Sequence, residues 1–155
     1  MTTPRARPLV GLLLVATIGF AAGSEGDDDG LSDVARAAAR FDYLLHCSGC
    51  HLPDGSGAPP EVPSLRGPMG ALVATPEGRD YIARVPEVAQ APLADDALAR
   101  VLNWVLLEFN GETLPSGFRP MGTAEVGVAR AKVLADPLRA REALVGGYAD
   151  KTPTD

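Results

Sequence analysis

Apolar positions along the chain recur every three or four residues, the spacing of helices, and nowhere show the alternation of a strand. The strongest pattern covers residues 95–109, and Asn110-Gly111 follows it as a stop signal. Its apolar stripe consists of Leu98, Val101, Leu102, Val105, Leu106 and Phe109. A second helix is predicted over residues 32–46, with Ser32 or Asp33 as its cap. Its apolar positions are Val34, Ala38, Phe41 and Leu45.

Capping signals predict shorter helices elsewhere. One begins at Thr75-Pro76 and runs to about Val85, and two more begin at Thr123 and at Asp136-Pro137, ending by Gly146-Gly147. Residues 52–63 are dense in glycine and proline and should form a loop. The 155-residue chain is therefore expected to be all-α and to form one core.

The N-terminus has the order of a secretory signal peptide. Arg5 and Arg7 precede an apolar run over residues 9–22, and Ala21-Ala22-Gly23 offers small residues for cleavage. The run is short for a membrane span, which needs about 20 residues, so a retained anchor is the less favoured alternative. We predict a signal peptide at 1–23, export to the periplasm, and a flexible acidic lead-in at 24–30.

Charge narrows the choice of partners. Loss of the two signal-peptide arginines changes the formal net charge from −6 to −8. This acidic balance disfavours nucleic acid and anionic membrane surfaces as partners. We therefore expect no nucleic-acid partner and no stable membrane insertion after cleavage.

Cys47-Ser48-Gly49-Cys50-His51 is the stretch with the most definite chemistry. Two thiols at this spacing can each add to a vinyl group of haem, and the imidazole of the next residue can bind the iron. We predict one covalent haem c per chain, with Cys47 and Cys50 as attachment sites and His51 as iron ligand. Export agrees with this interpretation, and both cysteines of the chain are used.

The motif has two other chemical uses. A thioredoxin-like redox pair would follow a strand within βαβ units, whereas residues 41–46 end a predicted helix. A structural zinc site needs two further Cys or His ligands, and His46 is the chain's one other histidine. His46 is expected to point away from the iron.

The helix that leads into CxxCH, the Gly/Pro-rich loop and the later helix PLADDALARVLNWVLLEF together resemble a class I cytochrome c. The resemblance implies a cytochrome c domain at 31–110, with residues 111–155 as a helical C-terminal extension. In that family the first and last helices cross beside the haem. Phe41 and Trp104 match the aromatic positions expected at this crossing.

The family implies an electron carrier, not an enzyme, that passes single electrons between redox partners such as a periplasmic dehydrogenase and a terminal oxidase. Residues 62–86 are also similar to small cytochromes that accompany periplasmic quinone-cofactor dehydrogenases. The alternatives are an open-site haem enzyme or sensor, peroxidase-like or gas-binding, and a dedicated haem subunit of a dehydrogenase complex.

The second iron ligand departs from the family pattern. Class I cytochromes place a methionine in the loop before the last haem-packing helix, but residues 85–92 contain none. Met69 and Met121, each within Pro-Met-Gly, are the remaining candidates beside the initiator. We expect Met69, which lies in the part that resembles the family; Met121 and an iron without methionine are the alternatives.

Burying the haem propionates would require hydrogen-bond donors or cations. Candidate residues are Arg66, Arg79, Arg84, Tyr81 and Trp104. Pro63 and Leu65 are expected near the haem, with the Pro63 carbonyl accepting a hydrogen bond from the His51 imidazole.

Overall fold

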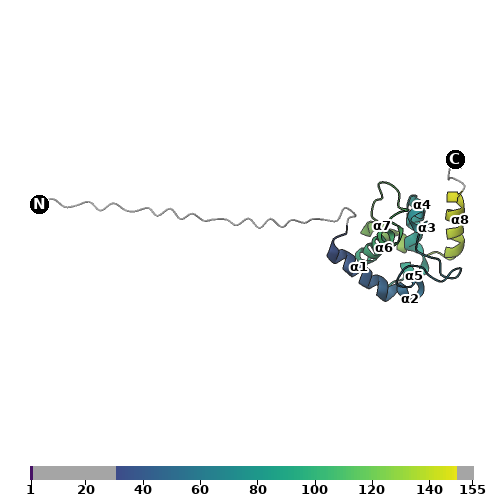
Figure 1. The fold of residues 1–155 in the computed structure, drawn as a ribbon, viewed down its shortest axis with the longest axis horizontal. Coiled ribbons are helices and arrows are strands. Elements are labelled where there is room, and N and C mark those ends of the chain that lie inside the picture. Colours follow the sequence, from purple (N-terminus) through teal and green to yellow (C-terminus); the bar gives the residue numbers. More distant parts are fainter. Residues whose placement is uncertain (2–30, 150–155) are drawn as a thin grey trace.

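The computed structural model describes Met1 and residues 31–149, without the side chains of 147–149 (Figure 1). The predicted signal peptide beyond Met1, and the acidic lead-in, lie outside the described residues. The described helices are α1 (Asp33–His46), α2 (Ser48–His51), α3 (Pro68–Leu72), α4 (Pro76–Arg84), α5 (Pro86–Ala89), α6 (Asp95–Asn110), α7 (Thr123–Arg130) and α8 (Pro137–Ala149). Between them, the extended structure in this part of the chain amounts to an isolated bridge from Ala58 to Val62. The all-α prediction is confirmed.

Helix starts follow the capping residues that the sequence indicated. The Ser32 hydroxyl accepts from the Ala35 amide at 3.3 Å at the start of α1. The Thr75 hydroxyl accepts from the Gly78 amide at 3.1 Å at the start of α4. These bonds satisfy amides that have no partner within the helix. None of the helices in the described part is long and apolar enough to cross a membrane.

Helix α6 is the centre of the fold and packs against α1, α3 and α7. Its predicted apolar stripe is buried from Leu98 to Leu106, and Trp104 is buried beside it. One side of α6 packs into a main core with α3, α4 and α7. Its other side meets α1 in a smaller aromatic cluster that contains Tyr43, Trp104 and the half-buried Phe109. Figure 1 places α1 and α8 at opposite sides of the fold.

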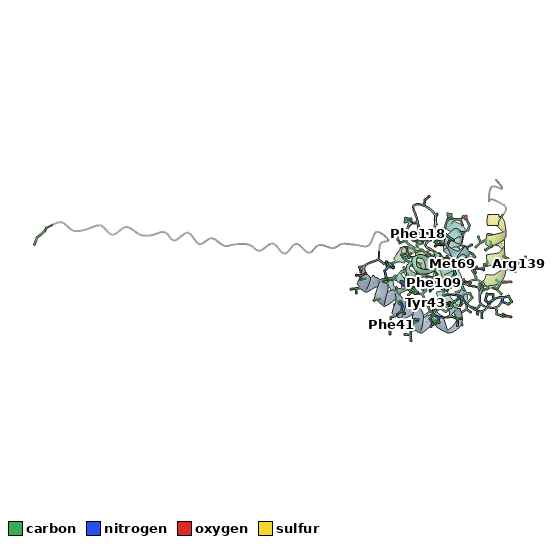
Figure 2. All side chains as sticks on the ribbon, viewed as in Figure 1. Phe41, Tyr43, Met69, Phe109, Phe118 and Arg139 are labelled. Atoms are coloured by element: carbon green, nitrogen blue, oxygen red, sulfur yellow. The ribbon has the colours of Figure 1, made fainter. Side chains whose placement is uncertain are left out.

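The predicted inner face of α1 is wrong. Phe41 is 66% exposed, whereas Ala39 and Tyr43 are fully buried. The Tyr43 ring centroid lies 5.0 Å from that of Trp104 and 5.5 Å from that of Phe109 (Figure 2). Tyr43, rather than Phe41, is therefore the aromatic residue at the α1–α6 crossing. A periodic pattern alone does not distinguish them, because α1 carries apolar residues on two opposite faces.

The segment after residue 110 belongs to the same core. Helix α7 packs against α4 and α6, and α8 packs against α3 and α4. Met121, Val126 and Ala129 are buried in the main core. The described part of the predicted extension thus completes the fold around α6 instead of lying beside a finished domain.

Candidate haem-binding site

The cysteine–histidine motif forms a tight turn between two helices. The Cys47 amide ends α1 by donating to the Tyr43 carbonyl at 2.8 Å. The His51 amide then donates back to the Cys47 carbonyl at 3.0 Å, which makes residues 48–51 the single-turn helix α2. The Ser48 hydroxyl donates to the Leu44 carbonyl at 2.8 Å and fixes the turn on the end of α1.

A buried tyrosine fastens the far side of the motif. Leu52 adopts a left-handed φ of 60°, which turns the chain sharply after His51. The Tyr43 hydroxyl donates to the Leu52 carbonyl at 2.6 Å. Burial, the largest cause, raises the pKa of Tyr43 to about 12, so the hydroxyl keeps its donor proton at neutral pH. The motif is thus held at both ends by one residue of α1.

The two thiols lie in different surroundings. Cys50 is exposed and Cys47 is half-buried, and neither forms a disulfide. Burial first, and Asp42 second, raise the pKa of the Cys47 thiol to about 11. A redox-active dithiol needs a lowered pKa, so this environment disfavours the thioredoxin-like alternative. Among the described residues, no group of three or more His, Cys, Asp or Glu side chains could hold a metal ion, which disfavours the zinc alternative as well.

His51 is prepared to bind a metal as a neutral imidazole. Its pKa is lowered, mainly by burial and also by Arg141, while the Pro63 backbone and Glu87 act in the opposite direction. Its Nδ1 atom is buried without a hydrogen-bond partner among the described residues. A haem-ligating histidine binds iron through one nitrogen and donates from the other to an acceptor such as a carbonyl. The Pro63 carbonyl acts on this imidazole, so the residues present fit haem c.

Both candidate methionines are buried in the main core. Met69 lies in α3 and is 5% exposed, and Met121 lies before α7 and is 3% exposed. The amide of Gly70, next to Met69, donates to the Asn110 side chain at 3.3 Å. The fold thus brings the two sulfur-bearing side chains into one cluster, although they are 52 residues apart in sequence. The choice between them as iron ligand stays a prediction.

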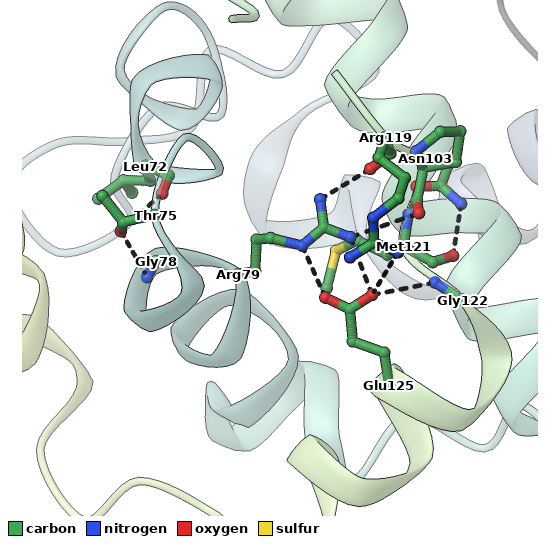
Figure 3. Close-up of polar contacts among 10 residues, drawn as sticks. Leu72, Thr75, Gly78, Arg79, Asn103, Arg119, Met121, Gly122 and Glu125 are labelled. Atoms are coloured by element: carbon green, nitrogen blue, oxygen red, sulfur yellow. Dashed lines mark hydrogen bonds and ion pairs between the residues drawn. The ribbon is translucent and has the colours of Figure 1, made fainter. Parts of the chain in front are cut away.

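Asn103 and Arg79 hold the segment that carries Met121 (Figure 3). The Asn103 side chain accepts from the Met121 amide at 2.7 Å and donates to the Met121 carbonyl at 3.0 Å. Arg79 donates to both carboxylate oxygens of Glu125, at 2.6 and 2.8 Å, and to the Arg119 carbonyl at 2.7 Å. Arg79 is 9% exposed, so its charge depends on these partners.

The other proposed propionate donors have mixed positions. Arg84 donates to the Lys132 carbonyl and pairs with Asp80, both within 2.7 Å, and the exposed Arg66 pairs with Asp54. Trp104 is buried in the aromatic cluster. Tyr81 is buried, and its pKa is raised first by that burial and lowered in part by Arg141. Of the candidates, Tyr81 is thus linked to the His51 region, through Arg141.

Sequence reasoning did not single out Arg141 or Arg130. Arg141, on α8, interacts with His51 and Tyr81, and its guanidinium lies 3.5 Å from the Ser64 carbonyl. Arg130, on α7, donates to the Ala89, Ala91 and Leu93 carbonyls at 2.7–2.9 Å. These carbonyls belong to the methionine-free loop. The available sequence signal was the number of arginines in an otherwise acidic chain.

Comparison with curated proteins shows that the chain belongs to the c-type cytochromes, the haem-containing electron-transfer proteins. Cytochrome c-552 of Thermus thermophilus is 31% identical over 106 residues, which is 57% of this chain and 81% of that protein. A second cytochrome c-552, from another strain of the same species, has the same identity over 106 residues and is covered to 72%. No family model and no solved structure matches the chain. Membership of this family implies covalently bound haem c.

Proposed function

We propose that this protein is a periplasmic class I cytochrome that carries one electron at a time on a single haem, attached to Cys47 and Cys50. The observation that carries the proposal is His51, whose buried Nδ1 lacks a partner and whose imidazole is acted on by the Pro63 carbonyl directly after CxxC. Haem, when bound, supplies the one-electron redox chemistry. The chain's own residues attach it, orient the imidazole and exclude water.

The division of labour among these residues follows from their positions. Cys47 and Cys50 provide one half-buried and one exposed thiol at the same turn. Hydrogen bonding of the His51 Nδ1 proton to Pro63 would fix the ring and raise its basicity toward iron. Tyr43 keeps the turn closed through Leu52. None of these roles requires an acid or base that cycles during a reaction, as expected for a carrier and not an enzyme.

Location and partners follow from the sequence. The predicted signal peptide supports export, and the periplasm is where haem c attachment would take place. An acidic carrier favours redox partners with basic docking surfaces, because opposite potentials speed encounter. A periplasmic dehydrogenase is the proposed donor and a terminal oxidase the proposed acceptor.

One observation favours a second candidate, an open-site haem enzyme or sensor. The loop before α6, where the family places its methionine, has none and is bound by Arg130 of α7. Unless Met69 or Met121 supplies the second ligand, the iron would keep a free position for peroxide or a gas.

Mass spectrometry and visible spectroscopy of the exported protein test the proposal. We expect the mass of one haem on each processed chain and resistance of that haem to acidified acetone. Cys47→Ser with Cys50→Ser should abolish covalent attachment, whereas Ser48→Ala should retain it. Haem that acidified acetone removes from the wild type would refute the attachment. Rapid binding of carbon monoxide or azide by the wild type would instead favour the open-site candidate.

A further inference from the structure

The outer face of α1 carries a continuous apolar seam that nothing in the described fold covers. Val34 is 81% exposed, Phe41 66% and Leu45 64%, and Ala38 between them is also exposed. Ala39 and Tyr43, on the opposite face of the helix, are fully buried. Figure 2 shows Phe41 at the periphery, with Tyr43 directed inward. A group of large apolar side chains on one exposed face marks an interaction surface more often than a chance distribution does.

The spacing of the seam is that of a coiled-coil helix. Val34, Ala38, Phe41 and Leu45 follow one another at intervals of four, three and four residues. This is the a/d pattern through which two helices pack side by side. An apolar face used only for transient contact needs no such register. The pattern therefore indicates a helix as the partner.

We propose that the partner is α1 of a second copy, packed antiparallel across a two-fold axis. In this register Ala38 of each copy lies level with Phe41 of the other, and Val34 lies level with Leu45. Each large ring then faces a small side chain, and both layers occur twice, as an isologous interface requires. A parallel pair would instead place Phe41 against Phe41 and leave a gap between the two Ala38 residues.

Charge also favours the antiparallel arrangement. The acidic stretch at residues 24–30, with one glutamate and three aspartates, leads into α1, so a parallel pair would bring two such stretches together. An antiparallel pair separates them by about the length of the 14-residue α1, roughly 21 Å, well beyond a Debye length of about 8 Å. Beside the seam, Ala35, Ala37 and Leu44 are uncharged, and Asp42 lies 3.7 Å from Arg100 of its own chain.

Sedimentation velocity of the haem-loaded, processed protein over a range of concentrations tests the proposal. We expect a reversible dimer that strengthens with added salt, because salt screens the repulsion between two acidic copies. Phe41→Asp should weaken dimerisation about tenfold or more, since it buries a charge in the seam. Val128→Asp is the matched control: it changes an equally exposed valine on α7 and should leave the dimer intact.

A double variant tests the register. Ala38→Arg combined with Phe41→Asp places an arginine of each copy level with an aspartate of the other, and should restore dimerisation relative to Phe41→Asp alone. Circular dichroism and the haem spectrum verify that each variant folds. A wild type that stays monomeric at all concentrations would overturn the proposal and leave the seam to a different protein. Equal loss of the dimer in Val128→Asp, or no recovery in the double variant, would overturn the assigned interface.

Discussion

The Tyr43 hydroxyl and the Leu52 carbonyl, 2.6 Å apart, close a ring of chain that contains both cysteines and the histidine. The same tyrosine packs its ring against Trp104 and Phe109. The position of the haem motif is thereby coupled to the α1–α6 crossing. This coupling explains why a tyrosine, rather than the equally apolar Phe41, faces inward: its buried ring also brings a donor to a carbonyl that needs one.

Tyr43→Phe should keep the aromatic contacts and remove the hydrogen bond. We expect the free energy of unfolding, measured by urea titration of the haem-loaded protein, to fall by about 0.5–1.5 kcal/mol. Ser56→Ala is the control, because it removes an exposed hydroxyl bond to Asp54 in the neighbouring loop and should cost less. An equal loss in the two variants would show that the Tyr43 hydroxyl has no special role.

Gly78→Ala tests how closely α4 approaches the end of α3. A Cβ at Gly78 would collide with the Leu72 carbonyl oxygen, which is backbone and cannot turn aside. We expect a loss of about 1–3 kcal/mol and a lower melting temperature. Gly146→Ala, a helical glycine with open space around it, should be neutral or slightly stabilising by comparison.

Glu125 predicts a specific acid sensitivity. The Arg79 guanidinium holds the pKa of this carboxyl below its usual value. A group with a lowered pKa in the folded state stabilises the fold above its unfolded pKa, and the stabilisation is lost as pH falls through the folded pKa. Glu125→Gln should therefore destabilise the protein at neutral pH and flatten the decline of the unfolding free energy below about pH 4.3. Glu108→Gln, which changes an exposed carboxyl of α6, should leave the decline unchanged.

Met69→Leu and Met121→Leu should separate the two candidate iron ligands. Leucine preserves volume, so each variant removes the sulfur with little change in packing. We predict that only Met69→Leu loses the charge-transfer band of methionine-bound ferric haem, lowers the reduction potential and admits azide. The same changes in Met121→Leu alone would assign the ligand to the segment before α7. No change in either variant would show that methionine does not bind the iron.

The sequence was sufficient for the longer helices and insufficient for their faces. Ser32, Thr75 and the stripe of α6 marked α1, α4 and α6 because caps and 3.6-residue periodicity are local properties. Helices α2, α3 and α5 are only four or five residues long, too short for a periodic signal. The haem motif could be recognised because its chemistry lies within five consecutive residues.

Contacts across long stretches of sequence could not be predicted in this way. Arg79 was expected near the haem, but it pairs with Glu125, 46 residues later, because α7 folds back onto α4. The two apolar faces of α1 are alike in sequence, and only the position of Trp104 on α6 shows that Tyr43 faces inward. Burial of an arginine or choice of a helix face depends on the partner helix, which local patterns do not specify.

The fork that Asn103 makes with Met121 limits where this chain can gain or lose residues. Because one side chain binds both peptide groups of Met121, a single insertion between Arg119 and Glu125 would misalign either that fork or the Arg79 pair. Gly117, with open space around it, is under no such constraint. Length differences among relatives should therefore accumulate at residues 111–117, which also makes this stretch the safest place for an engineered tag.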